Sequence, residues 1–256
     1  MTDNNIVPDF PSRVGENIRL ENVQFHPETV MKLSQKIKPK VSQGPDGYPP
    51  YLLKKILPAI ADPICMLFQS FMSVGKIPLE WKSAVITPLY KKGVSSDPSN
   101  YRPVSLTSVF SKLMERVVVL DLITYLQSNN VINKQQHGFL KKRCTATNLL
   151  ESLNDWTLNI ENGRRQAVAY IDFAKAFDSV CHNKLLTKMR QYGIGGSLLE
   201  YIADFLTGRT QQTRVGAALS DINVIISGVI QGSYITLHYI TSVSYTHLTL
   251  PTNREV

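Results

Sequence analysis

The stretch AVAYIDFAKAFD, residues 167–178, carries the strongest signal for the fold of this chain. Its first five residues are apolar and predict a buried strand, which runs directly into Asp172 and then into a sharp turn. A carboxylate at the end of a buried strand must be paired, hydrogen-bonded or bound to a cation, because burying it alone is very costly. Mg²⁺ is a natural partner, since it prefers carboxylate oxygens together with phosphates. The alternative for this stretch alone is a structural aspartate that pairs with an arginine or caps the next turn.

The hydrophobic pattern around this strand predicts an α+β fold, with helices first and then a strand, further helices and a hairpin. Within the expected helix over 145–160, Leu149, Leu150, Leu153 and Trp156 share one face and are expected to point into the core. Helices are expected over 51–57, 62–74, 108–129, 145–160, 183–192 and 197–206, and strands over 83–90, 167–171, 211–215 and 223–226.

Positive charge is concentrated in one quarter of the chain. The net charge is +8, and the segment 82–143 holds ten Lys or Arg against three Asp or Glu, so that 10 − 3 = +7 lies there. Such a concentration suggests a surface for a polyanion, because phosphate neutralisation supplies most non-specific affinity for nucleic acids. A solvated face that only keeps the protein soluble is the alternative.

The remaining composition excludes several classes of protein. The three cysteines are widely spaced without a CxxC pair, which predicts free thiols and no zinc site. His137 and His182 lack ligand spacing and are expected to be packing or capping residues. The longest apolar run, around 117–126, is far shorter than the ~20 residues of a membrane span, and no signal-peptide pattern follows Met1. An intracellular protein without a membrane partner is therefore expected, in the nucleus or the cytoplasm.

The residues after Asp172 carry a resemblance to a known family. Small Ala174 and Ala176 let the turn return Phe177 beside the acid, and the whole stretch resembles motif A of reverse transcriptases, particularly those of non-LTR (LINE-like) retrotransposons. Seven further blocks follow the order of that family and together cover roughly residues 30–233. They are GPDG from 44, IPLEWK from 77, PLYKKG from 88, NYRPVSL from 100, QHGFLKKRCTATNLL from 136, TGRTQ from 207 and SGVIQGS from 227.

The resemblance implies an RNA-directed DNA polymerase with a right-hand fold, of which this chain holds the fingers and an incomplete palm. Asp172 and the backbone carbonyl of Phe173 would bind Mg²⁺, two ions in the intact family, which activate the primer 3′-hydroxyl and stabilise the leaving pyrophosphate. Phe177 corresponds to the steric gate that excludes a ribonucleotide 2′-hydroxyl, and a plain core phenylalanine is its alternative. The implied partners are an RNA template, a DNA primer and a dNTP.

Further contacts follow from the same blocks. Asp178 is expected to have a structural role, in which it caps the helix that follows it and holds the turn, rather than to bind metal. The basic run at 141–143 could equally be a solvated charge run. The resemblance assigns dNTP contacts to Arg102, to Lys91 or Lys92, and to Gln231, and assigns template backbone contacts to Lys141, Lys142 and Arg143.

The partner carboxylates of motif C are not found in this sequence. No adjacent Asp-Asp pair occurs, and the only acidic residue after Asp221 is Glu255. We therefore expect this polypeptide to be catalytically inactive although its family is enzymatic. We also expect marginal stability, with Ile171, Val224 and Ile226 facing unfilled space.

The blocks predict four segments. Residues 1–25 are expected to form a tail or linker, 26–165 the fingers and early palm helices, and 166–233 a partial palm from motif A to the start of motif B. The segment 234–256 does not follow the family pattern. Within it, VSYTHLTLPT from 243 resembles a translated sequencing adaptor, so 243–256 is expected to be foreign to the gene, and a genuine terminal tail is the alternative.

Two alternative functions are compatible with parts of this pattern. A non-catalytic nucleic-acid-binding fragment would use only the basic segment 82–143. Another branch of the polymerase fold, such as group II intron or retron enzymes, is disfavoured by the NYRPVSL and QHGFLKKRCT blocks.

Overall fold

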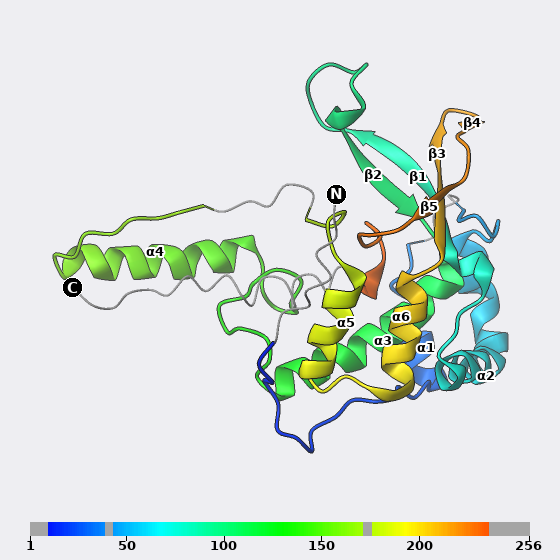
Figure 1. Cartoon of the computed structure of the whole chain (residues 1–256), viewed down its shortest axis with the longest axis horizontal. Coiled ribbons are helices and arrows are strands. Elements are labelled where there is room, and N and C mark those ends of the chain that lie inside the picture. The colour runs from blue at the N-terminus through cyan, green and yellow to red at the C-terminus, as the bar shows by residue number, and fades with distance from the viewer. Residues whose placement is uncertain (1–9, 39–42, 171–175, 236–256) are drawn as a thin grey trace.

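The computed structural model of the 256-residue chain describes residues 10–38, 43–170 and 176–235. A body of packed helices carries a small sheet that rises from one side of it (Figure 1). The helices are α1 (Pro27–Ser34), α2 (Pro50–Val74), α3 (Val109–Ser128), α4 (Thr145–Glu161), α5 (His182–Gln191) and α6 (Gly196–Leu206), with 3₁₀ turns η1 (Leu79–Lys82) and η2 (Pro98–Asn100).

Helix α3 is the central element of the core. It begins after Ser108, whose hydroxyl accepts a hydrogen bond from the Ser111 amide at 3.4 Å, as the capping pattern predicts. It packs against α1 and α2, and α6 also contacts α2. Its fully buried residues include Leu113, Met114 and Val118. The expected helix over 108–129 is thereby confirmed.

Helix α2 is one continuous helix, so the predicted break at Pro58 and new start at Asp62 are wrong. Pro58 and Pro63 both lie inside it, on its exposed side. Each proline costs about 3 kcal/mol in an isolated helix. Core packing on the other side, through residues such as Phe68, outweighs that cost. The helix ends as predicted at Gly75, which has φ +66°.

By length and apolar composition alone, α2 would also suit a membrane span. Seven of its residues are buried within the protein. These are Leu53, Leu57, Ala61, Ile64, Cys65, Phe68 and Met72.

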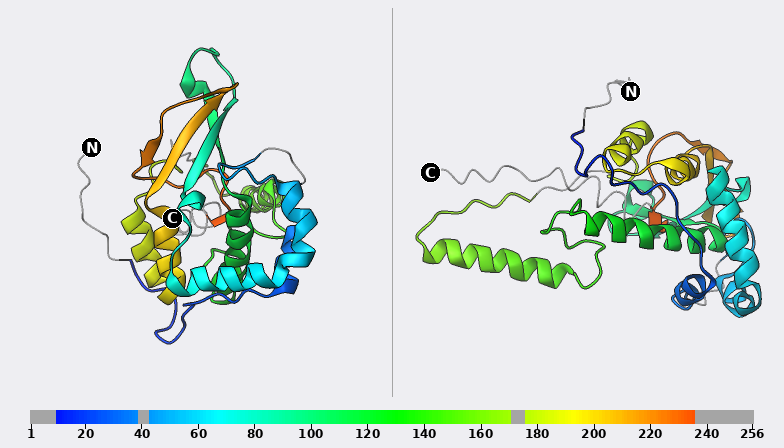
Figure 2. Two further views of the ribbon diagram at one scale, coloured as in Figure 1. Left: turned by 90° about the vertical axis from the view of Figure 1, so that its right-hand side faces the viewer. Right: turned by 90° about the horizontal axis from the view of Figure 1, so that it is seen from below.

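Helix α4 has the predicted bounds but not the predicted burial. It projects from the body in the views of Figures 1 and 2, and none of its residues is buried. Leu149, Leu150 and Leu153 are 44–66% exposed, so the expected inward face is wrong for the described structure. A helical period of apolar residues shows that one face of the helix favours burial. It does not specify which element buries that face.

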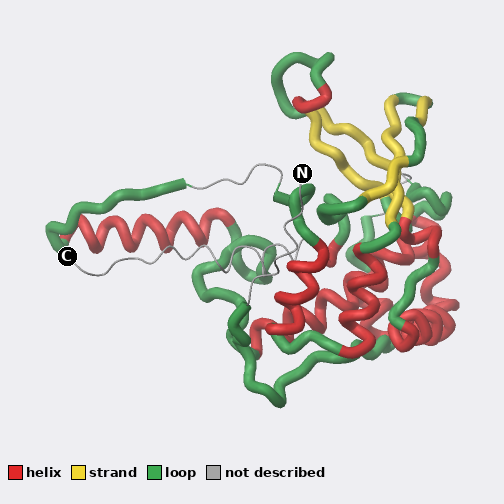
Figure 3. Tube along the Cα trace, in the orientation of Figure 1, coloured by secondary structure: helices red, strands yellow, loops and turns green. Residues whose placement is uncertain are grey.

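The sheet has the strand order β2-β1-β3-β4, and β5 also pairs with β3 (Figure 3). β1 is antiparallel to β2 and parallel to β3, while β3 and β5 form the predicted antiparallel pair with Thr210 opposite Val224. The strands are β1 (Ser83–Tyr90), β2 (Tyr101–Leu106), β3 (Arg209–Val215), β4 (Ala218–Leu219) and β5 (Asn223–Ile225).

The predicted motif A strand is not present in its described part. Residues 164–170 form no strand, and Tyr170 is 86% exposed, whereas a buried strand was expected. An apolar strand is stable only when neighbouring strands take up its backbone hydrogen bonds, and none of the described strands pairs with this segment. Ile171 lies outside the described residues. Val224 and Ile226 are 69% and 89% exposed, in line with the expectation that their side chains are not packed against other residues.

Residues 10–25 do not form a free tail, in contrast to the expectation for 1–25. Leu20 exchanges backbone hydrogen bonds of 2.9 and 3.1 Å with Gly193 and Gly195, between α5 and α6. Val23 and Phe25 are buried in the core. The few apolar residues of this segment thus suffice to hold it against the body.

The Lys188 amine gives a pH-dependent contribution to stability. Burial lowers the pKa of Lys188 to about 8. Between pH 8 and 10.5 the unfolded chain keeps this proton while the folded chain loses it, so the wild type gains stability as pH rises. We expect the unfolding free energy of the wild type to rise relative to that of Lys188→Met as the pH increases from 8 to 10.5. Urea titration of both proteins at each pH would measure this difference. A difference that stays constant with pH would contradict this assignment.

Candidate active site

A cleft of about 450 Å³ lies between the sheet and the two segments that match motifs A and B. β1 and β2 line it with Ile86 and Ser105, and the end of the chain's described part lines it with residues 224–231. Asp178 is the one acidic side chain among its described lining residues. Residues far apart in the sequence thus meet at one site.

The motif A turn is bonded directly to the motif B loop. The Val229 amide donates to the Phe177 carbonyl and the Gly228 amide donates to the Val180 carbonyl, both at 2.9 Å. His182 Nε2 lies 2.6 Å from the Gly228 carbonyl oxygen, which supports the packing role expected for this histidine. These three contacts hold the motif A turn against the motif B loop.

Gly228 is needed where the two motifs touch. Its φ is +82°, and a Cβ at this position would lie 2.8 Å from the Asp178 carbonyl oxygen and 2.9 Å from its Cα. Both facts disfavour a side chain at this position. The left-handed backbone conformation is strained for residues with a Cβ, and a Cβ would clash with the backbone of the opposing turn.

We expect Gly228→Ala to destabilise the protein by about 2–4 kcal/mol, of which about 1–2 kcal/mol reflects the positive φ and the remainder the clash. Gly216→Ala is the matched control, since Gly216 has φ +60° but open space around its Cα. Urea unfolding of the two variants would measure the difference. Equal losses for both would show that the approach of Asp178 to Gly228 contributes nothing.

Gln231 is held at the cleft by β2. Its carbonyl accepts a hydrogen bond of 3.1 Å from the Ser105 amide, so NYRPVSL and motif B adjoin in space. Arg102 of the same strand is exposed and is not among the lining residues. Because side chains alternate along a strand, Arg102 lies on the face opposite to Ser105. Lys91 and Lys92 are exposed in the turn after β1, and neither lines the cleft.

The basic run at 141–143 lies before α4, away from the cleft lining. Lys141 and Lys142 are exposed. Arg143 instead donates to the carbonyls of Lys134 and, at 2.8 Å, Gln136, which closes the loop that precedes α4.

His137 of this loop bonds to Thr147 at 2.9 Å and Glu151 at 2.8 Å, as expected for a packing or capping histidine. The three cysteines are free thiols, as predicted.

Asp178 does not cap α5, which corrects the expected role. Cys181 is the residue at the N-cap, and no side chain caps this helix. Asp178 is exposed, and its backbone packs against Gly228. Phe177 is half-buried against the core cluster, and its carbonyl is the acceptor for Val229.

Glu115 of α3 is a site-supporting residue that the sequence pattern did not reveal. It is fully buried, and its Oε2 accepts from the Ser233 hydroxyl at 2.6 Å and the Tyr234 amide at 2.9 Å. Its Oε1 accepts from Ser111 at 3.1 Å. An acidic residue within an otherwise apolar helical run was the available signal.

Arg209 is the second residue missed by sequence reasoning, although the TGRTQ block contains it. It is 2% exposed, lines the cleft, and donates to the carbonyls of Phe205 and Trp81 at 2.8 and 2.9 Å. Burial lowers the pKa of Arg209 to about 10, and the charge of Glu115 opposes this shift. The guanidinium therefore ties the end of α6 to η1 beneath the cleft.

The described residues do not form a metal site. Among them, no group of three or more His, Cys, Asp or Glu side chains could hold a metal ion. Asp172 and Phe173, the expected ligands, lie outside the described residues. The donors that the structure does describe at the cleft, with Asp178 as their sole carboxylate, do not fit a catalytic cation.

Comparison with known proteins identifies the family. Residues 89–244 match the family described as reverse transcriptase (RNA-dependent DNA polymerase). The chain is 31% identical over 207 residues, 80% of its length, to the RNA-directed DNA polymerase from mobile element jockey of Drosophila melanogaster. It is 26% identical over 171 residues, 66% of its length, to the probable RNA-directed DNA polymerase from transposon X-element of the same species.

A third relative is the Pol polyprotein from the type-1 retrotransposable element R2 of Popillia japonica, 29% identical over 161 residues or 62% of this chain. The chain spans only 22%, 19% and 22% of the lengths of these three relatives. The match starts at residue 89, after the cleft-lining residues Ala84 and Ile86 of β1, and continues through β2, the motif A turn and the motif B loop to residue 244. The chain therefore belongs to the reverse transcriptase family, in the group found in non-LTR, LINE-like retrotransposons.

Proposed function

We propose that this chain is part of an RNA-directed DNA polymerase that copies an RNA template onto a DNA primer. The observation that carries the proposal is the direct bonding of the motif A turn to the motif B loop across Gly228, at the edge of a cleft. That contact brings the turn from Phe177 to Val180, which follows the expected catalytic strand in sequence, beside the expected nucleotide-binding loop. In this proposal the helical body and the β1–β2 ribbon belong to the fingers and early palm of a right-hand fold.

The residues of the chain take separate roles in this function. Asp172, helped by the Phe173 carbonyl, would hold Mg²⁺, and bound ions would supply the charge stabilisation of phosphoryl transfer. Phe177 would select against a ribose 2′-hydroxyl. This role requires its side chain, which packs against the core cluster and does not line the cleft, to turn toward a bound nucleotide. Gln231 contacts the nucleotide, and its backbone is already fixed by Ser105 at 3.1 Å.

The fingers contacts are proposed for Arg102 and for Lys91 or Lys92, whose exposed positions on the β1–β2 ribbon leave them free to meet a triphosphate. Because these side chains do not line the cleft, this role requires the ribbon to close over a bound nucleotide.

We further propose that the 256-residue polypeptide by itself does not extend a primer. Its sequence lacks an adjacent Asp-Asp pair, so the cation would have a single carboxylate ligand from motif A. Purified polypeptide with primer, template, dNTPs and Mg²⁺ is expected to give no product. Extension that disappears in Asp172→Ala would overturn the proposed inactivity.

The polymerase function itself is tested in a chimera. Residues after 233 are replaced by the segment that follows motif B in the jockey relative, and RNA-templated primer extension is measured. Activity is expected in the chimera and in its Asp178→Asn control, and a loss of more than about 10³-fold is expected for Asp172→Asn. A folded chimera whose activity survives Asp172→Asn would refute the role of this carboxylate.

A second function, nucleic-acid binding without catalysis, is favoured by the +7 segment over 82–143. It predicts RNA affinity that falls steeply with salt concentration and requires neither Mg²⁺ nor dNTP. Such a role is compatible with an intracellular protein.

A further inference from the structure

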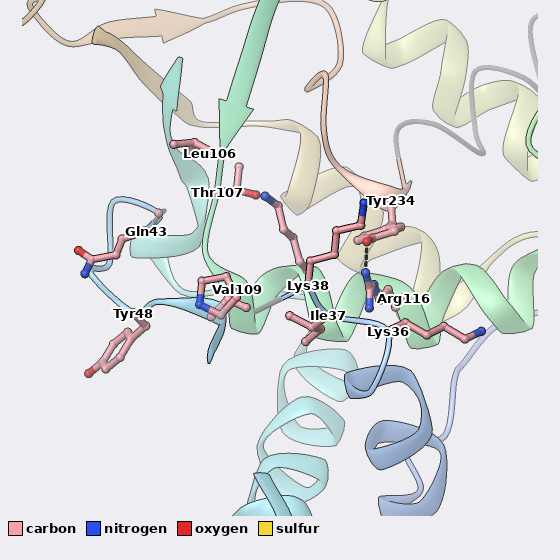
Figure 4. A pocket seen from close by; sticks show the side chains of 13 residues that line it. Lys36, Ile37, Lys38, Gln43, Tyr48, Leu106, Thr107, Val109, Arg116 and Tyr234 are labelled. Atoms are coloured by element: carbon pink, nitrogen blue, oxygen red, sulfur yellow. Dashed lines mark hydrogen bonds between the residues drawn. The ribbon is translucent and has the colours of Figure 1, made fainter. Parts of the chain in front are cut away.

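A second cavity, of about 360 Å³, lies beside the turn that joins β2 to α3. Its walls come from the end of α1, the GPDG block, the turn after β2 and the first turns of α3, and Tyr234 closes one side (Figure 4). Four cationic side chains line it, Lys36, Lys38, Lys112 and Arg116, and its described lining includes no acidic residue.

The cationic side chains of this cavity differ in their interactions with the rest of the protein. Arg116 donates to the Leu33 carbonyl at 3.0 Å and to the Tyr234 hydroxyl, and its guanidinium lies 4.3 Å from the centre of the Tyr234 ring. Lys112 is partly buried, and its side-chain amine makes no hydrogen bond or ion pair with the residues that the structure describes. Burial lowers the pKa of Lys112, while the charges of Glu115 and Asp46 oppose that shift.

Thr107 supplies an independent observation that points to an anion at this cavity. The residue is 4% exposed and lines the cavity, and its hydroxyl has no partner among the described residues. A buried hydroxyl without a partner costs about 1–3 kcal/mol, so an acceptor in the cavity would recover that energy. Gly44 packs so closely on Thr107 that a Cβ would lie 2.6 Å from the Thr107 carbonyl oxygen, which fixes this wall.

The cavity also opens beside an exposed aromatic ring. Tyr48 lines it, is 49% exposed, and is held edge-on against Phe110 with ring centroids 5.5 Å apart. Cationic groups beside an aromatic face are typical of sites for single-stranded nucleic acids, where a base stacks next to a bound phosphate. A free inorganic anion would make no use of that ring.

We propose that this cavity binds a backbone phosphate of a single-stranded nucleic acid, with Lys38 and Lys112 as cationic ligands, the Thr107 hydroxyl as donor and Tyr48 as the surface on which the adjoining base stacks. Two ammonium groups and a hydroxyl among the residues that line one cavity suit an anion with several acceptor oxygens. The proposal rests on the proposed nucleic-acid function. It adds a second anchoring point, joined to the cleft through the segment from Gln231 to Tyr234.

The test is RNA binding by the 256-residue polypeptide, measured by fluorescence anisotropy over a range of salt concentrations. A labelled RNA of about a dozen nucleotides is long enough for such a site. Lys112→Gln is expected to weaken binding about 3–10-fold and to reduce the slope of log K against log salt by about 0.7. Thr107→Val is expected to weaken binding about 2–5-fold without changing that slope. Lys55→Gln removes an exposed lysine of α2 outside both cavities and serves as the matched control.

Acetylation footprinting read by mass spectrometry gives a second measurement that needs no variant. RNA should protect Lys112 and Lys38 but not Lys55, whereas AMP or orthophosphate at equal phosphate concentration should protect neither cavity lysine. Equal protection by AMP would mean a site for a free nucleotide and would overturn the strand proposal. Wild-type RNA binding with both cavity variants matching Lys55→Gln would overturn this site alone. No salt-dependent RNA binding by the wild type would overturn the nucleic-acid function as well.

Discussion

Glu115→Ala is expected to lower the free energy of unfolding by about 3–5 kcal/mol. The substitution removes a fully buried carboxylate and leaves the Ser111 hydroxyl, the Ser233 hydroxyl and the Tyr234 amide without their acceptor. It also removes the acidic charge that acts on buried Arg209. Urea denaturation followed by circular dichroism would measure the loss.

The variant Glu115→Gln separates the contribution of side-chain size from the contribution of the negative charge to stability. Glutamine keeps the size and one acceptor oxygen, so a smaller loss of about 1–2 kcal/mol is expected. Glu80→Ala, at an exposed position in η1, should change stability by less than about 0.5 kcal/mol. A loss for Glu115→Ala no larger than that of Glu80→Ala would contradict the role of this carboxylate as the anchor of residues 233–234.

Asp204→Ala is expected to cost about 3–5 kcal/mol, because it breaks a buried ion pair by removing one partner. Asp204 Oδ1 lies 2.9 Å from Lys82 Nζ, and the two side chains are only 14% and 10% exposed. The other oxygen, Oδ2, accepts from the Ile77 amide at 2.9 Å. Without Asp204, the Lys82 ammonium and this amide remain buried and unpaired, which the free energy of unfolding from urea titration would register.

Two variants test the reason for that loss. Lys76→Ala removes a 73% exposed lysine 3.9 Å from the same carboxylate and should cost no more than about 1 kcal/mol. The double variant Lys82→Met with Asp204→Leu replaces the pair by apolar side chains and should recover much of the stability. A double variant as unstable as Asp204→Ala would show that the cost comes from lost packing and the lost Ile77 hydrogen bond rather than from an uncompensated charge.

Elements with strong local signals could be predicted from the sequence. The strand over 83–90, the end of α2 at Gly75 and the start of α3 after Ser108 all depend on residues within one or two turns of chain. The hairpin arms now seen as β3 and β5 were predicted for the same reason. In each case the residue pattern and the capping residue agree, so little depends on distant parts of the molecule.

Elements whose state depends on neighbours were predicted less well. The apolar residues of 167–170 indicated a buried strand, but no described strand pairs with them. The apolar face of α4 indicated core packing, yet this face is exposed. α2 continues through Pro58 and Pro63 because core contacts on its other side compensate for them. Periodicity reports which surface favours burial, whereas packing decides whether it is buried.

The sequence by itself determined the family, since ordered motifs such as IDFAKAFD and SGVIQGS can be recognised without coordinates, and it determined most helices and strands through local patterns. Only the tertiary structure decided that Val229 bonds to Phe177, that Glu115 holds Ser233 from 118 residues away, and that Arg102 faces away from the cleft lining. These outcomes depend on hydrogen bonds and close approaches between residues far apart along the chain. Their geometry is fixed by how the helices and the sheet pack, for which a linear pattern of residue types contains no direct signal.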